Sequence, residues 1–378
     1  MEINCMTASQ ALSLLERIDE KYKPVWDGRG SEDQIALAQY FLPHNSQRPV
    51  LAPTRPRIIK WYCPFASQQE FPTGHRYCIN VYTGCDHRCV YCYAAGYEPT
   101  LAGSKKDFQT LIRKDMQDLQ RYNVTPAPVH LSNSTDPFQP LERECSHTRC
   151  ALEQILANRY RFTTVAILTK NPLLAAQPDY LDLLQQLATL PADHPRYGEF
   201  AHRGLPGFVI EVSLAFWREE AARAYDPGAP TVAQRIEGIA LLHRAGIPLV
   251  LRIDPLFPRS PIQGKPPATL ADFGLPEAQT MDDLENLVAL AKDMNARHIV
   301  YSPAKIVLPR GRDLSETLQT LRAVYAALAA PQKLVWRGRS WRLPQDVAEA
   351  EIVRPFLEIC RRRGVLAKYC KHNLIETP

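Results

Sequence analysis

Three cysteines lie close together in the segment GCDHRCVYCYA, at Cys85, Cys89 and Cys92. A zinc site usually takes four ligands from two separated pairs, and no second C-x-x-C pair occurs in this chain. Three thiolates on one loop instead suit an iron–sulfur cube, in which the protein holds three irons and leaves the fourth open. The spacing therefore predicts a [4Fe–4S] cluster whose open iron can bind a small molecule.

Strand-like and helix-like segments alternate around this cysteine loop. The strand candidates are continuous apolar runs, as expected for strands buried on both faces, at 78–84, 128–133, 164–170, 207–215, 248–255 and 297–304. The helix candidates between them are 106–122, 147–160, 179–190, 231–246 and 280–297. This alternation predicts an α/β fold with a parallel sheet and right-handed crossovers, and it places the cysteine loop at the carboxyl end of the first strand.

The chain is expected to have three parts. Residues 1–75, with one amphipathic helix at 11–22 and a Pro-rich stretch, read as an arm that wraps the core. Residues 76–304 form the core, and residues 305–378 form a C-terminal helical extension. The Pro-rich segment 258–269 has no periodicity and is expected to be a loop over the carboxyl end of the fifth strand.

Composition gives weaker constraints. Lys and Arg number 45 against 40 Asp and Glu, a net charge of +5 that permits an anionic partner without requiring one. No apolar run approaches the length of a membrane span, and acidic residues interrupt the first twenty positions, so we expect a cytoplasmic protein with no membrane association. Ten cysteines in such a chain favour metal or redox chemistry over a disulfide framework.

The C-x-x-x-C-x-x-C spacing, with Tyr91 before the third cysteine, resembles the cluster motif of radical S-adenosylmethionine (radical SAM) enzymes. The segments LSNSTDPFQPLE, ILTKN, EVSLA and HRAGIPLVLRIDPLFP further resemble spore photoproduct lyase and related DNA-repair-photolyase-like proteins, over about residues 76–304. This resemblance implies a partial (β/α)6 TIM-like barrel.

The resemblance also implies cofactors and their contacts. The cofactors are a [4Fe–4S] cluster and S-adenosylmethionine (SAM). In this family the reduced cluster cleaves SAM to a 5′-deoxyadenosyl radical, which abstracts hydrogen from the substrate. In that family, tyrosines flank the third cysteine as Tyr91 and Tyr93 do here, and a lysine and a serine matching Lys170 and Ser213 contact the methionine end of SAM. Thr135 and Asp136 fall where the family also reaches the cofactor.

Asn133 departs from this pattern. Spore photoproduct lyase carries a hydrogen-donating cysteine at the matching position, and an amide cannot return a hydrogen atom as a thiol can. Either the thymine-dimer reaction is not this chain's reaction, or Cys145 or Cys150 replaces the missing thiol. An inert, buried Cys145 is the simpler alternative.

Several other residues have two interpretations. Lys170 could pair with the SAM carboxylate or with a structural carboxylate, and Asp136 could hold a ribose hydroxyl or cap a turn at Pro137. Arg252 and Asp254 could pair with each other or face the substrate, and Glu211 within a strand needs a partner. Four further cysteines could bind an auxiliary metal, although their spacing matches no ligand pattern: Cys63, Cys78, Cys360 and Cys370.

Basic and aromatic residues gather near the C-terminus, which resembles a nucleic-acid footprint or equally a solvated charged face. They are Trp336, Arg337, Arg339, Trp341, Arg342, Arg361, Arg362 and Arg363.

The leading hypothesis is a lyase-like radical SAM enzyme that acts on a nucleic-acid or nucleotide-like substrate, as DNA repair lyases do. Its electron donor would be a protein such as flavodoxin or ferredoxin. The alternatives are a radical SAM enzyme that modifies a protein or a small metabolite, and a zinc-stabilised nucleic-acid-binding module without catalysis.

Overall fold

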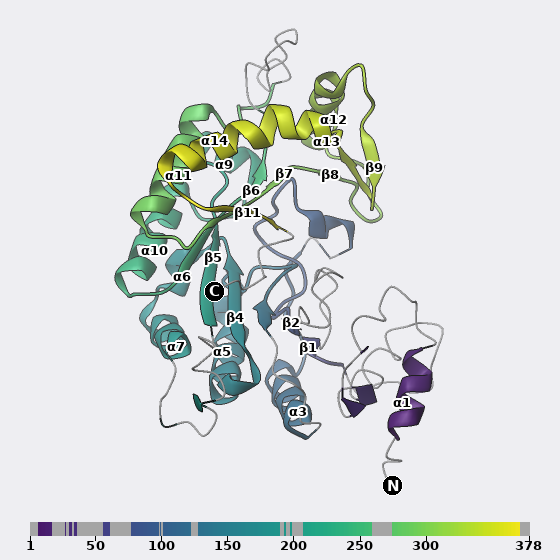
Figure 1. Ribbon diagram of the computed structural model, residues 1–378, viewed down its shortest axis with the longest axis vertical. Coiled ribbons are helices and arrows are strands. Elements are labelled where there is room, and N and C mark those ends of the chain that lie inside the picture. The colour runs from purple at the N-terminus through teal and green to yellow at the C-terminus, as the bar shows by residue number, and fades with distance from the viewer. Residues whose placement is uncertain are drawn as a thin grey trace.

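A computed structural model shows a curved, mostly parallel sheet covered on one face by helices (Figure 1). The structure describes residues 7–16, 27, 30–31, 34–35, 56–60, 77–97, 99, 101–121, 128–189, 193, 197–198, 207–258 and 274–370. Cys63, most of the predicted loop at 258–269 and the end of the predicted helix at 11–22 lie outside these ranges. Of that helix, α1 (Ala8–Leu15) is described.

The main sheet has eight strands in the order β1-β2-β3-β4-β5-β6-β7-β11. Six of them match the six predicted strands: β2 (Tyr77–Ile79), β3 (Val129–Leu131), β4 (Thr164–Thr169), β5 (Gly207–Ser213), β6 (Leu249–Leu256) and β7 (Ile299–Pro303). These six are parallel neighbours in chain order. Right-handed crossovers between neighbouring parallel strands put the helices that connect them on the same face, as in a barrel. The predicted α/β class with a partial (β/α)6 barrel is therefore confirmed.

Two short strands at the edges of the sheet were not predicted. β1 (Ile59–Lys60) pairs antiparallel with β2, and β11 (Ala367–Tyr369) pairs parallel with β7. Both are only two or three residues long and partly exposed, so neither has an apolar run that a sequence pattern would reveal.

The helices of the outer layer also follow the prediction. They are α3 (Phe108–Arg121), α5 (His147–Ala157), α7 (Pro178–Ala188), α10 (Val232–Arg244) and α11 (Met281–Asp293). Local sequence fixes where the last two begin, because Thr231 with Gln234 and Thr280 with Asp283 form capping boxes. Three short helices were not predicted: α4 (Glu142–Cys145), α6 (Pro172–Ala175) and α9 (Glu219–Tyr225).

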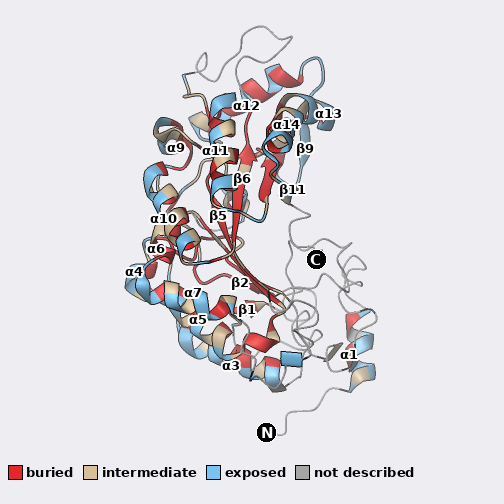
Figure 2. Cartoon of the chain, turned by 60° about the vertical axis from the view of Figure 1, so that its left-hand side comes forward, coloured by how far each residue is buried: buried red, intermediate tan, exposed pale blue. Residues whose placement is uncertain are grey.

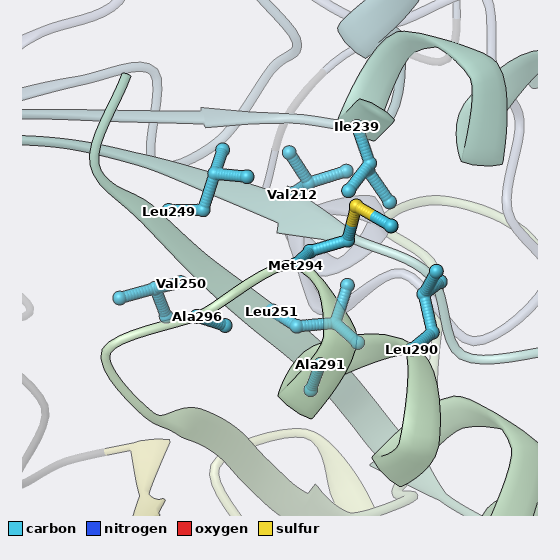
Figure 3. Close-up of a pocket in the computed structure, with 9 residues that line it drawn as sticks. All are labelled: Val212, Ile239, Leu249, Val250, Leu251, Leu290, Ala291, Met294 and Ala296. Carbon is cyan, nitrogen blue, oxygen red and sulfur yellow. The ribbon is translucent and has the colours of Figure 1, made fainter. Parts of the chain in front are cut away.

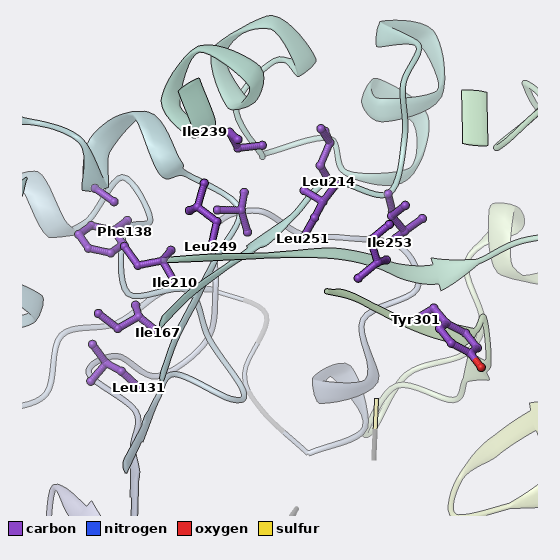
Figure 4. Packing of buried hydrophobic residues seen from close by; sticks show 14 of the residues in the cluster. Leu131, Phe138, Ile167, Ile210, Leu214, Ile239, Leu249, Leu251, Ile253 and Tyr301 are labelled. Atoms are coloured by element: carbon purple, nitrogen blue, oxygen red, sulfur yellow. The ribbon is translucent and has the colours of Figure 1, made fainter. Parts of the chain in front are cut away.

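The apolar core lies between the sheet and these helices. Figure 2 shows the central strands β5 and β6 as mostly buried, and Figure 4 shows side chains of neighbouring strands, among them Ile167, Ile210, Leu249 and Leu251, packed together. Alternate residues of a strand point to opposite faces. Glu211, which lies between Ile210 and Val212, therefore points to the other, concave face.

The chain after β7 contains more than the predicted helices α12 (Glu316–Ala329) and α14 (Arg354–Arg363), which follow the short α13 (Gln345–Ala348). A small antiparallel sheet has the order β8-β10-β9, with β8 (Ile306–Val307), β9 (Val335–Arg337) and β10 (Ser340–Arg342). No helix in the described part of the chain is long and apolar enough to cross a membrane.

Candidate cofactor site

The cluster loop, residues 84–92, follows β2 at the carboxyl edge of the sheet, and backbone contacts hold it in place. The Val90 N–H donates to the Tyr225 carbonyl at 2.9 Å, and the Gly228 N–H donates to the His87 carbonyl at 3.0 Å. Gly84 has a φ of +64°, a left-handed conformation that glycine adopts without strain. The connection between α9 and α10 thus supports the loop along its length.

The three predicted cluster ligands, Cys85, Cys89 and Cys92, are free thiols, each half-buried. Burial raises the pKa of all three, and the charge of Cys92 raises those of Cys85 and Cys89 further, so the thiols lie near one another. Within the described ranges, no group of three or more His, Cys, Asp or Glu side chains is arranged around a single metal ion. Soft thiolates on a partly exposed loop are the ligand type of an iron–sulfur cluster, so the donor set fits the predicted group.

His87, inside the loop, connects the cysteines to the loop after β3. Its Nε2 lies 3.0 Å from the Asp136 carboxylate, and its Nδ1 lies 3.2 Å from the Gly228 carbonyl oxygen. Burial alone would raise the pKa of Asp136, but the His87 imidazole and hydrogen bonds from Lys170 and Thr169 lower it overall. His87 was not predicted, although its position between two ligand cysteines was a signal.

Asp136 also bonds to its own loop. Its Oδ1 accepts hydrogen bonds at 2.8 Å from the Phe138 N–H and from the Thr169 hydroxyl, and its Oδ2 accepts one at 2.6 Å from the Lys170 N–H. Of the two predicted roles, turn capping is therefore present in the geometry. The neighbouring Thr135 hydroxyl is buried and has no hydrogen-bond partner among the described residues.

Lys170, Tyr91 and Ser213 come together from three elements. The Lys170 ammonium donates to the Tyr91 hydroxyl at 2.8 Å and to the Ser213 hydroxyl at 2.9 Å. It also lies 3.4 Å from the Asp226 carboxylate, which accepts a short hydrogen bond from Tyr91. The predicted cofactor lysine thus has a protein carboxylate as a neighbour, directly beside the cluster loop.

Asp226 is the main site residue that sequence reasoning missed. It ends α9, is buried, and forms an ion pair at 3.0 Å with Arg235 of α10. Burial alone would raise the pKa of Asp226, but Lys170 and Arg235 together hold it well below its usual range. The sequence Asp-Pro-Gly between two helices indicated a turn, but nothing in it indicated an ion pair with a strand-end lysine.

Asn133 lies on the loop after β3, beside Tyr93. The Tyr93 hydroxyl donates a short hydrogen bond to the Asn133 carbonyl, and the Asn133 side-chain amide lies 3.2 Å from the Cys78 sulfur. Cys145 ends α4 in the outer layer beside Tyr82, and Cys150 lies on α5. The thiol that contacts Asn133 therefore belongs to Cys78 of β2, which the sequence had suggested only as a possible ligand of an auxiliary metal.

Arg252 of β6 organises the concave face of the sheet. Its guanidinium donates to Glu211 at 2.5 Å, to Asp254 at 2.6 Å and to the Cys370 sulfur at 2.9 Å. His130 lies 3.8 Å from the other Glu211 oxygen. The predicted Arg252–Asp254 pair is present, and Glu211 has the partner that its burial requires.

The β9–β10 hairpin carries only the first part of the predicted basic and aromatic cluster, from Trp336 to Arg342. The remaining three arginines, 361–363, lie on α14, where Arg362 and Arg363 pair with Glu285 of α11. The Trp336 and Trp341 rings lie 4.5 Å apart, and Arg322 lies 4.4 Å from the centre of the Trp341 ring. Trp336 is 50% exposed, so one large aromatic face meets solvent. The segment just after β8 of this sheet contacts the chain just after the cluster loop, because the Arg310 N–H donates to the Ala95 carbonyl at 3.0 Å.

A separate apolar pocket lies between the sheet and the helices α10 and α11 (Figure 3). Its lining includes Val212, Ile239, Leu251 and Met294, and all nine of the drawn side chains are apolar. Such a lining offers no partner to a charged cofactor. The pocket is a packing feature on the face opposite Arg252.

Comparisons with known proteins find distant similarity. No family model matches the chain. An uncharacterized protein of Methanocaldococcus jannaschii is 25% identical over 187 residues, which cover 49% of this chain and 62% of the relative. An uncharacterized protein of Mycobacterium tuberculosis is 27% identical over 192 residues, 49% of this chain and 50% of the relative. The chain thus matches less than two thirds of either relative's length.

Two solved structures are similar in fold. Spore photoproduct lyase has a TM-score of 0.49 and 12% identity, covering 79% of this chain and 76% of that one. The radical SAM methyltransferase TsrM from Kitasatospora setae has a TM-score of 0.38 and 14% identity, covering 60% of this chain and 35% of that one.

Proposed function

We propose that this chain is a radical SAM enzyme whose cluster loop holds a [4Fe–4S] cluster. The observation that carries the proposal is the position of Cys85, Cys89 and Cys92 on one loop at the carboxyl edge of a parallel sheet, with the Lys170 ammonium beside it. Parallel α/β folds bind their ligands at this edge. When bound and reduced, the cluster would supply the electron that cleaves SAM to a 5′-deoxyadenosyl radical, which abstracts hydrogen from the substrate.

The surrounding residues have distinct tasks in this proposal. Lys170 and Ser213 would bind the carboxylate end of SAM, and Tyr91 would keep Lys170 directed at the cluster loop through their hydrogen bond. The unpaired Thr135 hydroxyl is available to a polar group of the cofactor. Tyr93 and Asn133, at the next loop, would contact the substrate.

We propose a nucleic-acid or nucleotide-like substrate and a lyase-like reaction. The support comes from the small sheet after β7. Its strand β9 carries the exposed Trp336 beside arginines, and its opposite edge, β8, is followed by Arg310, whose N–H bonds to Ala95 just after the cluster loop. Burial lowers the pKa of Arg342, Tyr369 opposes this shift, and the nearby Arg337 charge adds to it. Aromatic faces and arginines together bind single-stranded nucleic acid. The electron donor would be a flavodoxin or a ferredoxin.

The test is anaerobic reconstitution of the full chain, with iron content, electron paramagnetic resonance and SAM cleavage as readouts. Single replacement of Cys85, Cys89 or Cys92 by Ala should abolish the four-iron spectrum and SAM cleavage, because each thiolate holds a different iron. Cys150→Ala in the outer helix layer is the matched control and should retain both. A colourless protein that binds zinc, or a triple-cysteine variant that keeps its cluster, would refute the assignment.

The substrate class needs its own measurement. Binding of single-stranded DNA and RNA at several salt concentrations should weaken steeply with salt, because phosphate contacts release counterions. Reconstituted enzyme given deuterated candidate substrates should then transfer deuterium to 5′-deoxyadenosine only from a nucleic-acid or nucleotide substrate. Transfer from a protein or a small metabolite instead would show that the substrate class is wrong.

A further inference from the structure

Asp226 is a single buried carboxylate shared by two cations. One of its oxygens lies 3.0 Å from the Arg235 guanidinium and 3.4 Å from the Lys170 ammonium, and the other accepts the Tyr91 hydrogen bond. The side chains of Asp226 and Arg235 are both fully buried, whereas that of Lys170 is 13% exposed. Of the two cations, Lys170 is the one that a ligand in the site can reach.

The charges in this cluster do not balance. Lys170 and Arg235 carry two positive charges and Asp226 one negative charge, while Tyr91 and Ser213 are neutral hydrogen-bond partners. Asp136 also accepts a hydrogen bond from the Lys170 backbone, and its carboxylate lies 3.0 Å from the His87 Nε2. Lys170, Arg235 and Asp226 therefore sum to a net charge of +1, a count that leaves out the neighbouring Asp136 and the Cys89 thiol, which also bonds to Asp226. The Arg235 Nη2 has no hydrogen-bond partner among the described residues. A partly buried surplus charge favours an anion that can neutralise it.

We infer that Asp226 and Arg235 set the charge that Lys170 presents, so that this end of the site accepts one carboxylate. This inference rests on the proposed SAM-binding function and assigns to it two positioning residues. Asp226 acts through Lys170, and Arg235 acts through Asp226. The preference of the site for a carboxylate should follow the net charge of the three residues rather than the presence of any one of them.

The experiment compares the affinities of reconstituted full-chain protein for SAM and for decarboxylated SAM, by anaerobic equilibrium dialysis. The two ligands differ only in the carboxylate. The dissociation constant of decarboxylated SAM divided by that of SAM therefore measures how strongly the site recognises the carboxylate. Asp226→Asn raises the net charge to +2 and should increase the ratio about tenfold, whereas Arg235→Gln lowers it to 0 and should decrease the ratio about tenfold. The double variant Asp226→Asn/Arg235→Gln restores +1 and should return the wild-type ratio.

The double variant also serves as a control for folding defects in the single variants. Removing one member of a buried ion pair can destabilise a protein strongly, whereas neutralising both costs less, and thermal unfolding of each variant checks this. A ratio that falls in both single variants and in the double variant would overturn the inference, as would an unchanged ratio in all three. If wild-type protein binds neither ligand, the proposed function itself fails, which is a different outcome.

Discussion

Gly228→Ala tests whether the turn between α9 and α10 controls the cluster loop. An added Cβ at Gly228 would lie 2.0 Å from the Asp86 carbonyl oxygen and 3.0 Å from the His87 Cα. The φ of Gly228 is not in the left-handed region, so alanine brings no intrinsic backbone strain, and the whole effect comes from this contact. The contact is with backbone atoms, which cannot rotate away as a side-chain end could.

The size of the effect follows from the displacement that alanine requires. A normal contact distance is reached only if the cluster loop or the turn moves by roughly 1 Å or more, and overpacking of this kind costs about 1–3 kcal/mol. The same movement would break the hydrogen bond between the Gly228 N–H and the His87 carbonyl, now 3.0 Å long. We therefore expect both a loss of about 2–3 kcal/mol in the free energy of unfolding and a fall in iron bound per chain.

Urea unfolding of the apoprotein and iron content after reconstitution measure the two effects separately. Gly96→Ala is the matched control, because its Cβ would lie 3.4 Å from the Val307 Cγ1 and 3.9 Å from the Leu308 carbonyl oxygen, both ordinary contacts, although Gly96 also lies close to the cysteines in sequence. Gly96→Ala should keep wild-type iron and stability. If Gly228→Ala has wild-type iron content and a free energy of unfolding within about 0.5 kcal/mol of wild type, the turn does not position the loop.

Four further predictions concern other parts of the chain. Lys170→Met should weaken SAM binding about tenfold to a hundredfold without loss of iron, since a charge-assisted hydrogen bond contributes about 1.5–3 kcal/mol; unchanged affinity in dialysis would give Lys170 a role in the fold alone. Wild-type enzyme should cleave SAM without substrate yet fail to repair spore photoproduct, and Asn133→Cys should add a hydrogen donor with no change in iron content; efficient repair by wild type would contradict this. Trp336→Ala should weaken single-strand binding about tenfold, because stacking contributes about 1–3 kcal/mol per base, and an equal affinity in a fluorescence titration would exclude the hairpin. The pKa of Glu211 is lowered by its arginine partner although burial alone would raise it, so its ionised form stabilises the fold above about pH 4 and this contribution is lost as the pH falls. Glu211→Gln should therefore reduce the free energy of unfolding in urea at pH 7 and make it depend less on pH below about pH 4. A variant whose stability falls with acid as steeply as that of wild type would argue against this.

The sequence was informative where a strong local pattern existed. The six core strands are continuous apolar runs, and each was predicted within a few residues of its observed bounds. The cluster ligands were predicted from cysteine spacing, and Lys170 and Ser213 from the resemblance to spore photoproduct lyase. β9, which is exposed along its length, and α9, which has seven residues, carry too little periodicity to be recognised.

Contacts between distant segments could not be read from the sequence. Asp226 meets Lys170 only because the end of α9 lies against the end of β4, and Cys78 meets Asn133 only because β2 and β3 are neighbours. The substitute thiols considered from the sequence, Cys145 and Cys150, were chosen by nearness along the chain. Nearness across the sheet depends on strand order, which the folded structure supplies.

The pairing of β11 with β7 has a consequence for how the chain folds during synthesis. β7 ends at Pro303, but its outer hydrogen-bonding edge is satisfied only by residues 367–369. After β7 has been synthesised, the residues of α12 and α14 must still be synthesised before β11 can pair with that edge. Until then the unpaired strand edge can pair with another chain. The nascent core is therefore exposed to aggregation over this interval, and a stop codon just before residue 367 would make that exposure permanent.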